Sequence, residues 1–439
     1  MPAPLMTIQS TPDLPPAADV VVIGGGIVGC STAYYLARKG ISVALIEKGH
    51  VGAEQSSRNW GWCRQQNRDA RELPMATRSL DLWEEMARDI GEDPGFRRCG
   101  LLYLSDDEAE IAGWARWRDM ARGMGVTTHM LTGAEATERG GVTGKAWKGG
   151  VHSPFDGISD PARACPVIAR GIMAAGGTVH QMCAARGLEL SGGRVSAVVT
   201  EHGTIATTCV VMAGGAWASS FCHQLGVVFP QASVRSSIMT VMPGVEGPDA
   251  LHTKGISLTR RGDGGYAMAI SGEARVDPSP QQIAHARHFV PMFAKRWRIL
   301  RPGGSQAWRS GHETRKRWRL DAPTPMERMR VLDPTPDKGA LRRIHARAAK
   351  LVPAIADAKV QATWAGYIDS TPDGVPAIGE TGVPGLVLAA GFSGHGFGIG
   401  PGAGEMIADM VSGAKPHLDP APYHPDRFAR SSWGKVSEF

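Results

Sequence analysis

Residues 20–47 decide the fold and read VVVIGGGIVGCSTAYYLARKGISVALIE. The stretch opens with an apolar run rich in β-branched residues, passes through a glycine turn and a helix-compatible segment, and ends with a second apolar run closed by Glu47. A strand, a glycine turn, a helix and a strand within about thirty residues are the context in which GxGxxG indicates a dinucleotide-binding site. The glycines of this pattern are Gly24, Gly26 and Gly29.

Each residue of the pattern has a physical task. Gly24 permits the tight turn, Gly26 lets the backbone approach a pyrophosphate, and Gly29 lets the helix lie close to the strand. The first N–H groups of the helix then point toward the phosphates. The carboxylate of Glu47 is placed to accept hydrogen bonds from both hydroxyls of an adenosine ribose, and it would repel the 2′-phosphate of an NADP-type cofactor.

Length and charge limit the class of protein. A chain of 439 residues is too long for one ordinary hydrophobic core, so two domains are expected. The net charge of +6 is a small bias over this length, and no nucleic-acid-binding motif accompanies the basic residues, so no nucleic-acid partner is expected. No apolar run reaches the length of a membrane span, so no transmembrane segment is predicted.

The cysteines and the N-terminal residues indicate in which cellular compartment the protein is expected. The seven cysteines are irregularly spaced and include no CxxC pair, which argues against a disulfide framework, a metal site and a flavin disulfide reductase. The N-terminal residues lack the basic start and apolar stretch of a secretion signal. We therefore predict a cytoplasmic protein that binds no metal.

Signals of a nucleotide-binding domain recur at the start, in the middle and near the end of the chain. The patterns predict helices over 73–90 and 109–123, apolar strands over 209–212 and 386–390, and a helix over 402–411. We predict an α/β (α+β) fold in which a Rossmann-like nucleotide domain is interleaved with a mixed-sheet substrate domain. The expected division is a flexible N-terminal tail over 1–17, the nucleotide domain over 18–90, 151–222 and 366–415, the substrate domain over 91–150 and 223–365, and a C-terminal tail over 416–439.

Four segments together resemble a known family, the FAD-dependent amine and amino-acid oxidoreductases related to D-amino-acid oxidase (the DAO superfamily). They are the stretch quoted first, CAARGLEL and VVMAGGAW within 160–217, WAGYIDSTPDGVPAIG over 364–379, and the glycine-rich 391–404. The family includes glycine and sarcosine oxidases, D-amino-acid dehydrogenases and bacterial L-amino-acid deaminases. The combination of QSSRNWGW with WAGYIDSTPDGVP is most similar to the L-amino-acid enzymes.

The resemblance implies an FAD cofactor and the residues along it. Residues 391–398 would cover the isoalloxazine ring, and the helix after them would direct its N-terminus at the pyrimidine edge, where reduced flavin is negative. The FAD is expected to be non-covalent, because the positions where relatives carry a linking Cys or His hold Trp364 and Arg58. The expected cofactor-binding residues are Gly24, Gly26, Ile27, Val28, Gly29, Glu47, Lys48, Gln55, Ser56, Ser57, Arg58, Asn59, Trp60, Gly61, Ala184, Ala185, Ala213, Gly214, Gly215, Trp217, Gly391, Ser393, Gly394, His395, Gly396, Phe397 and Gly398.

The chain has one strand–GxGxxG–helix unit with an acid at the right distance, whereas a flavoprotein reduced by NAD(P)H usually needs a second. The flavin is therefore expected to be reduced by an amine or amino acid and reoxidised by O2 or a quinone. The expected reaction transfers a hydride from the substrate Cα–H to the flavin and leaves an imine, which hydrolyses to a keto acid and ammonia. The protein supplies orientation, a dry pocket and charge complementarity.

The residues that bind the substrate carboxylate in relatives are missing. Ile368 stands where many D-amino-acid and glycine oxidases carry an arginine, and Gly398 stands where sarcosine oxidases carry a lysine. Either another cation binds the carboxylate, or the substrate is not a simple amino acid. Arg235 is the first candidate for that cation, and Arg64 and Arg275 are the next.

Three further residues complete the expected substrate site. His395 is expected to act either as a polar group of the pocket or as a residue that orients the backbone, and Trp364 is placed in the catalytic set beside it. Asp369 takes the place of a cation and would suit a pocket open to polar or basic side chains.

We predict an FAD-dependent oxidase or dehydrogenase of α-amino acids that favours L-amino acids, with O2 as the expected acceptor. Three alternatives stay open. A D-amino-acid or secondary-amine (sarcosine-like) enzyme would use the same scaffold. A flavin monooxygenase would need NAD(P)H features that the sequence lacks. A non-catalytic FAD-binding subunit of a complex would carry the cofactor without turnover, and the sequence leaves open whether the chain forms a homodimer.

Overall fold

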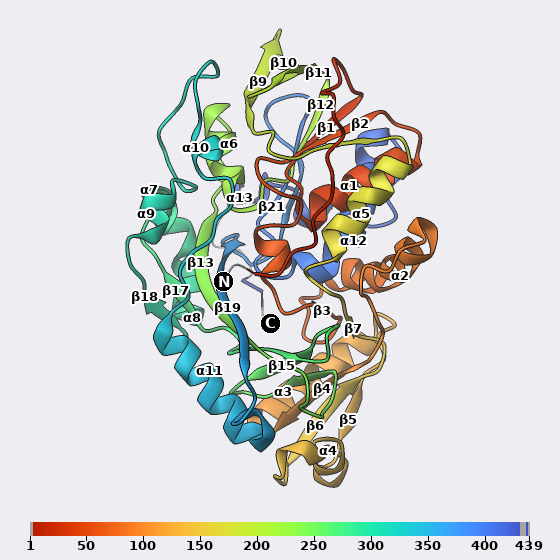
Figure 1. Cartoon of the computed structure of the whole chain (residues 1–439), viewed down its shortest axis with the longest axis vertical. Coiled ribbons are helices and arrows are strands. Elements are labelled where there is room, and N and C mark those ends of the chain that lie inside the picture. Colours follow the sequence, from red (N-terminus) through yellow and green to blue (C-terminus); the bar gives the residue numbers. More distant parts are fainter. Residues whose placement is uncertain (1–2, 431–435, 438–439) are drawn as a thin grey trace.

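Two large sheets organise the molecule. The computed structural model describes residues 3–430 together with 436 and 437, so the remaining residues of the two expected tails lie outside the described part. A six-stranded sheet forms the core of the upper half in Figure 1, and a ten-stranded sheet lies below it. The long strands β13 (Ala232–Val241) and β19 (Val360–Ser370) run side by side down the middle of the molecule.

The six-stranded sheet has the strand order β20-β21-β12-β1-β2-β8. Its strands are parallel, except that β20 is antiparallel to β21. Successive side chains face opposite sides, so Val20 and Val22 pack against helices while Val21 and Ile23 pack against a small sheet. The strands are β1 (Val20–Ile23), β2 (Val43–Ile46), β8 (Thr178–His180), β12 (Cys209–Met212), β20 (Ala377–Glu380) and β21 (Leu386–Ala390).

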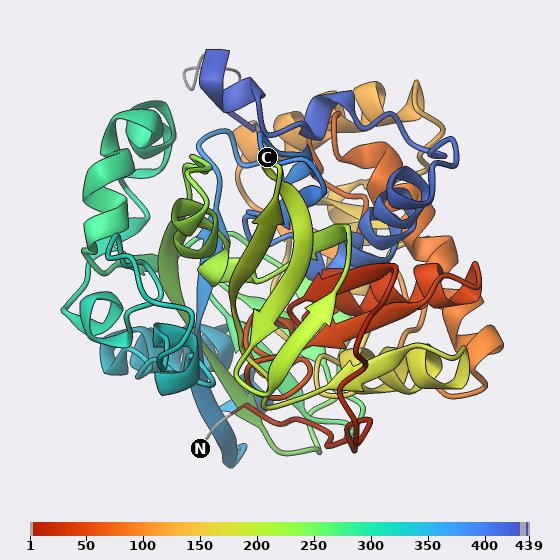
Figure 2. The same ribbon diagram turned by 90° about the horizontal axis from the view of Figure 1, so that it is seen from above.

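A helical layer covers one face of this sheet, and a three-stranded antiparallel sheet covers the other (Figures 1 and 2). The parallel order and the glycine turn after β1 make this half Rossmann-like, which confirms the predicted fold class. The helices are α1 (Ile27–Arg38), α2 (Leu73–Ile90), α5 (Ala164–Ala174) and α12 (Gly396–Ser412), and the small sheet holds β9 (Ala185–Ser191), β10 (Arg194–Thr200) and β11 (Gly203–Ala206).

Helix α12 begins at Gly396 rather than at the predicted residue 402. Glycine and proline disfavour a helix in isolation, which is why the sequence pattern placed its start too late. Here packing overrides that preference, because the glycines allow close contact with neighbouring helices. A Cβ added to Gly400 would lie 2.8 Å from Ile27 Cγ1, and one added to Gly404 would lie 2.5 Å from Ser31 Cβ.

The ten-stranded sheet has the order β18-β17-β13-β16-β15-β14-β4-β6-β5, with β19 paired to the other edge of β13. It is mixed, as predicted, since β14 pairs with β4 and β17 with β18 in parallel while the other pairs are antiparallel. Helix α11 (Lys338–Leu351) packs against β13 and β16. The other strands are β4 (Leu101–Ser105), β5 (His129–Leu131), β6 (Gly149–Ser153), β14 (Ala250–His252), β15 (Ser257–Arg260), β16 (Tyr266–Ala269), β17 (Ala274–Val276) and β18 (Leu300–Pro302).

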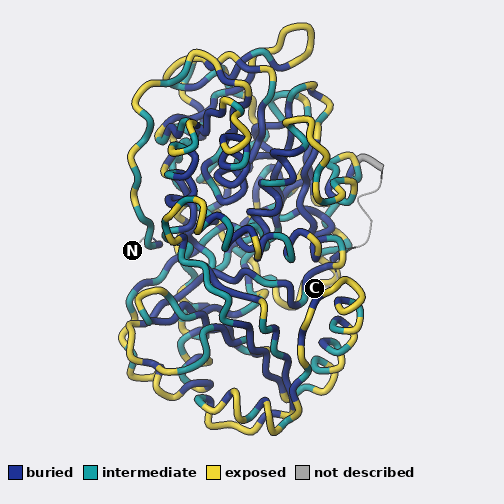
Figure 3. Tube along the Cα trace, turned by 90° about the vertical axis from the view of Figure 1, so that its right-hand side faces the viewer, coloured by how far each residue is buried: buried dark blue, intermediate teal, exposed yellow. Residues whose placement is uncertain are grey.

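Shorter elements complete the fold. Figure 3 shows that buried residues follow the sheets of both halves, whereas exposed residues gather on outer helices and loops. The division of the chain into domains at the residues given above stays a prediction. The remaining elements are β3 (Trp62–Cys63), β7 (Gly157–Ile158), α3 (Glu108–Arg122), α4 (Gly133–Arg139), α6 (Ala218–Gln224), α7 (Pro280–His285), α8 (Val290–Arg296), α9 (Gln306–Ser310), α10 (Pro325–Arg328), α13 (Arg427–Arg430) and the 3₁₀ turns η1 (Gln55–Ser57), η2 (Gly141–Thr143), η3 (Gly215–Trp217), η4 (Ala286–Phe289), η5 (Pro353–Ile355) and η6 (Ala421–Tyr423).

Both terminal segments are attached where the structure describes them. Backbone hydrogen bonds join Thr11 N–H to Val179 O (2.8 Å) and Ala206 N–H to Pro16 O (2.9 Å). The expected flexible N-terminal tail is therefore an extended segment paired to the nucleotide-binding half. Near the C-terminus, Arg427 Nε donates to Asp373 Oδ2 (2.9 Å), so this part of the expected tail also packs on the body of the protein.

No described helix combines the length and the apolar character that a membrane crossing requires. Within the described ranges, no three His, Cys, Asp or Glu side chains are grouped so that they could hold a metal ion. The seven cysteines are free thiols and form no disulfide bond with one another.

Candidate active site

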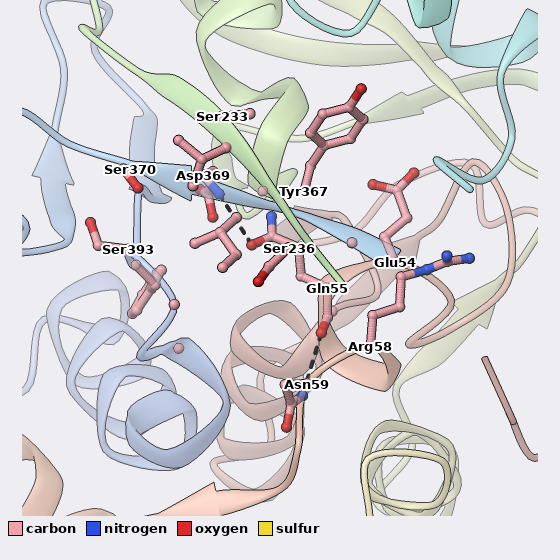
Figure 4. A pocket seen from close by; sticks show the side chains of 18 of the residues that line it. Glu54, Gln55, Arg58, Asn59, Ser233, Ser236, Tyr367, Asp369, Ser370 and Ser393 are labelled. Carbon is pink, nitrogen blue, oxygen red and sulfur yellow. Dashed lines mark hydrogen bonds between the residues drawn. The ribbon is translucent and has the colours of Figure 1, made fainter. Parts of the chain in front are cut away.

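A cavity of about 690 Å³ is lined by residues of both halves of the molecule. The volume lies within the usual range for small-molecule sites, about 300–1,000 Å³. One end is formed by β1, β2 and the start of α1, and the other by β13, β19 and the α7–α8 segment. Figure 4 shows the polar side chains of the middle of the cavity, which come from η1, β13, β19 and the loop before α12.

The glycine pattern forms the wall of the first end. Gly24 has φ +109°, a conformation that favours glycine. A Cβ on Gly29 would lie 1.9 Å from Gly24 O, so a larger residue would separate α1 from the turn. A Cβ on Gly26 would meet only Ser56 Oγ, at 3.4 Å, and the backbone at Gly26 therefore faces the cavity. Ile27 N–H, at the start of α1, donates to Ser56 Oγ (2.9 Å).

The carboxylate of Glu47 lies at the end of β2 and lines the cavity. Its two oxygens accept hydrogen bonds from Gly25 N–H and Gly49 N–H, both at 2.7 Å. Burial raises the pKa of Glu47, and Lys48 and these two amides oppose that shift. The two backbone bonds fix the orientation of the carboxylate at the edge of the cavity.

Sequence reasoning missed Glu54, one residue before the predicted segment. Its carboxylate pairs with Lys48 and accepts from Trp217 Nε1 (3.3 Å) and Leu332 N–H (3.0 Å). Burial raises the pKa of Glu54, but Lys48 outweighs burial and holds that pKa below its usual value. Lys48 Nζ lies 4.6 Å from the centre of the Trp217 ring. Lys48, Glu54 and Trp217 therefore form one side of the cavity, and the charge of Lys48 is balanced by Glu54.

Turn η1 carries the polar side chains of the middle section. In Figure 4, Gln55 lies between Asn59 and Asp369 and is hydrogen-bonded to both, at 3.4 Å each. Arg58 lines the cavity with its guanidinium held by Asp333 Oδ1 (2.6 Å) and Ala365 O (2.9 Å). The predicted run QSSRNWG is therefore brought to the cavity as a fixed wall.

Asp369 holds the glycine loop in place. Its Oδ2 accepts from Gly391 N–H (2.8 Å) and Gln231 Nε2 (2.9 Å), and its backbone oxygen accepts from Ser393 N–H (2.8 Å). Asp369 lines the cavity while protein donors hold its Oδ2, and the expectation that it suits a pocket open to polar or basic side chains stays a prediction. The loop leads into α12, whose first residues, Gly396 and Phe397, line the cavity.

His395 lines the cavity, and its Nδ1 lies 3.1 Å from Oε2 of the fully buried Glu72. Burial lowers the pKa of His395 to about 4, with Arg68 adding to the shift and Glu72 opposing it. The imidazole is therefore neutral at neutral pH, and Glu72 fixes its orientation.

Arg235 does not reach the cavity. On β13 its neighbours Val234 and Ser236 line the cavity, whereas Arg235 points away. Its guanidinium donates to Asp277 Oδ2 (2.7 Å), Asp277 Oδ1 (3.1 Å) and Thr335 O (2.7 Å). The prediction that Arg235 binds the substrate carboxylate is thus wrong, since all three guanidinium nitrogens already donate hydrogen bonds to Asp277 or Thr335.

Three other candidates also lie off the cavity lining. Trp364 is buried and donates from Nε1 to Arg58 O (3.2 Å). Arg64 donates to Gln66 O and lies 6.0 Å from the Trp62 ring centre. Arg275 pairs with Asp337. Each side chain has a structural partner instead.

The cofactor-binding residues expected from sequence divide into two groups. The residues that line the cavity are Gly24, Gly26, Ile27, Val28, Glu47, Lys48, Gln55, Ser56, Arg58, Asn59, Trp60, Ala185, Ala213, Gly214, Gly215, Trp217, Ser393, Gly394, His395, Gly396 and Phe397. The residues behind the lining are Gly29, Ser57, Gly61, Ala184, Gly391 and Gly398. The second group supports the first. For example, a Cβ on Gly398 would lie 2.9 Å from Trp62 O, so this glycine lets α12 approach β3.

The fold and the cavity define a dinucleotide-binding oxidoreductase of the flavin type. The sequence matches the DAO family, described as FAD dependent oxidoreductase, over residues 19–410. The chain belongs to this family, and its cofactor is FAD. The residues present fit that group, since the glycine-walled cradle at Gly26, the fixed carboxylate of Glu47 and the helix start at Gly396 lie along one cavity.

Three relatives illustrate the similarity. Glycine oxidase of Pseudomonas putida is 26% identical over 427 residues, which cover 93% of this chain and 98% of that protein. Mitochondrial sarcosine dehydrogenase of Mus musculus is 26% identical over 95% of this chain, but the chain spans only 42% of that protein's length. The structure of L-amino acid deaminase from Proteus myxofaciens in complex with anthranilate superimposes with a TM-score of 0.92 at 30% identity, covering 97% of both chains.

Proposed function

We propose that this protein oxidises α-amino acids, with L-amino acids favoured, to imines that hydrolyse to keto acids and ammonia. O2 is the proposed acceptor, and the cytoplasm is the proposed location. The observation that supports this proposal most directly is the continuity of the cavity. It extends from the carboxylate of Glu47, past the start of α12, to an apolar chamber between β13, β19 and α8. A small organic substrate in that chamber would lie beside the part of FAD where oxidation occurs.

In this proposal, the residues that line the first end hold FAD without a covalent bond. The amides at the start of α1 bind the pyrophosphate, and Glu47 accepts the ribose hydroxyls. When bound, FAD would supply the acceptor for a hydride from the substrate Cα–H. The N-terminus of α12 would favour negative charge on the reduced cofactor.

The protein's own residues then orient the amine and exclude water. The substrate nitrogen must be neutral so that its lone pair forms the C=N bond as the Cα–H hydride leaves. His395 contributes a neutral polar group in this section. The apolar chamber keeps bulk water away from the reacting carbon.

The preference for L-amino acids is supported by the TM-score of 0.92 with the Proteus deaminase. A second candidate is a secondary-amine or glycine oxidase, supported by the matches to sarcosine dehydrogenase and glycine oxidase. A non-catalytic FAD-binding subunit is the candidate of another class. One screen separates the three.

The test mixes the FAD-loaded protein anaerobically with both enantiomers of the common amino acids and with sarcosine, and follows the oxidised flavin absorption band. We expect L-amino acids to bleach the band. Bleaching by sarcosine or D-amino acids alone would select the second candidate, and bleaching by none of these substrates would overturn the proposed activity. Admission of air then shows whether O2 reoxidises the flavin.

A further inference from the structure

The outer end of the cavity is covered by α7, η4 and α8. Gln282 Nε2 ties this segment to Ser233 O (2.9 Å) and to Glu313 Oε2 (2.9 Å). Lys295 Nζ on α8 donates to Ser437 O (2.6 Å). The segment is thus attached near both ends. Its cavity-lining side chains are apolar with two exceptions, Gln282 and Arg296. The apolar ones are Ala286, Phe289, Val290, Met292 and Phe293, and Ile299 and Leu300 continue the apolar wall after α8.

Arg296 is half-buried and lines the cavity at the end of α8. Its guanidinium has no hydrogen bond or ion pair with any residue that the structure describes. Burial lowers its pKa, and no nearby carboxylate counteracts the shift. A partly buried cation that lines a largely apolar wall and has no counter-charge would gain from an anionic ligand, so this position favours one.

The other cavity-lining residues that are cationic at neutral pH already have acidic partners. Lys48 pairs with Glu54, and Arg58 pairs with Asp333. The cavity-lining carboxylates are also engaged: Glu273 pairs with Arg343, while Glu47 and Asp369 accept hydrogen bonds from protein donors. Among the described residues of the lining, Arg296 is therefore the unpaired charge, and it is positive.

We propose that Arg296 binds the carboxylate of the substrate and replaces the clamps that are absent at Ile368 and Gly398. This inference rests on the proposed oxidation of amino acids. A planar guanidinium can donate two parallel hydrogen bonds to a carboxylate, and the surrounding apolar side chains strengthen that pair by excluding water. The hydrogen bonds of Gln282 on α7 and of Lys295 on α8 hold the segment in position before the substrate arrives.

The test compares benzoate with its uncharged analogue benzamide, by calorimetric titration of the FAD-loaded protein. We expect the unaltered protein to prefer benzoate. Arg296→Met should weaken benzoate binding about 10- to 100-fold and leave benzamide binding unchanged, so that the preference disappears. Arg296→Lys keeps the charge but loses the paired donors, and it should fall between the two. Arg298→Met is the matched control, because Arg298 is exposed and does not line the cavity.

Flavin content and circular dichroism check that each variant is folded. With an amino acid that reduces the flavin, Arg296→Met should raise the substrate dissociation constant in anaerobic mixing and change the limiting reduction rate far less. Unaltered benzoate binding in both Arg296 variants, or equal binding of benzoate and benzamide by the unaltered protein, would overturn the role of Arg296 and leave the proposed function standing. Failure of every amino acid to bleach the unaltered protein would overturn the proposed function itself.

Discussion

The two ends of the cavity are assembled from different kinds of sequence. The end around Glu47 is built mainly from one uninterrupted stretch, in which β1, the glycine turn, α1 and β2 follow one another, with residues after β12 packed beside the turn. The end around Arg296 combines β13, β19 and the α7–α8 segment, which lie far apart in the chain. The first end relies on backbone groups, since amides hold Glu47 and glycines form the wall. The second end relies on side chains. A charged side chain there that pairs with another residue, as Arg235 does with Asp277, is not available to a ligand.

This difference explains why the role of a charged residue can be predicted from sequence at the first end but not at the second. At the first end each polar group is positioned by the turn next to it, so its role follows from its place in the pattern. At the second end, the adjacent residues Arg235 and Ser236 of β13 face opposite ways: Ser236 lines the cavity, and Arg235 lies in a buried ion pair.

Arg235→Met is expected to lower the free energy of unfolding by about 3–5 kcal/mol, because it leaves the fully buried Asp277 without its counter-charge. The affinity of the remaining folded protein for its substrate should not change. Urea unfolding of the FAD-loaded protein and anaerobic flavin reduction measure the two quantities. Arg319→Met, which removes a surface pair with Asp321, should alter neither. Weaker substrate binding at unchanged stability would return Arg235 to the substrate site.

Glu47→Gln is expected to weaken FAD binding about 10- to 100-fold, because an amide accepts weaker hydrogen bonds from the ribose hydroxyls than a carboxylate does. The fold should be retained, since the flanking strands and glycines are unchanged. Titration of the apoprotein with FAD, followed by quenching of flavin fluorescence, measures the effect. Glu380→Gln, on an exposed position of β20 in the same sheet, is the control. Equal FAD affinity in the two variants would contradict the role assigned to Glu47.

Glu313 should make stability depend on pH through the segment that carries Arg296. Burial raises the pKa of Glu313 to about 7, although Ser279, Ser233 and Gln282 donate to its carboxylate. Between its usual pKa and about 7, the folded state binds more protons than the unfolded state, so this contribution to stability falls as pH rises. The expected loss between pH 5 and pH 8 is about 2 kcal/mol.

Glu313→Gln should remove that loss. Unfolding of the variant and of the unaltered protein in urea at both pH values gives the difference directly. The exposed Glu246→Gln serves as the control. A pH dependence that is the same in Glu313→Gln and in the unaltered protein would show that Glu313 does not titrate in this range.

Periodicity and apolar runs predicted the regular elements well where local pattern and packing agree. The strands over 209–212 and 386–390 and the helix over 73–90 have the predicted bounds. The start of α12 was predicted too late, because its glycines serve contacts with α1 and α2 that no local pattern reveals. The N-terminal segment was taken for a tail, because the strands that pair with it are distant in sequence.

Contacts between distant residues also limited what the sequence could predict about the site. The glycine pattern and Glu47 could be placed from sequence alone, and so could the run from Gln55 and the loop before α12. Glu54 could have been included in the predicted site, since it directly precedes the predicted run that begins at Gln55. Its pairing with Lys48 is seen only in the structure. Arg296 carried no local signal, because it is one of several arginines in a basic stretch.

Residues 20–47 are enough to predict the nucleotide-binding half, because they form one strand–turn–helix–strand unit whose backbone geometry requires glycine at fixed positions. The sequence also showed that the familiar carboxylate clamps are missing at Ile368 and Gly398. Which of the cavity-lining cations lacks an acidic partner among the described residues could be seen only in the folded protein. The answer depends on pairing between distant residues: Asp277 takes Arg235, Asp333 takes Arg58, and no described carboxylate takes Arg296.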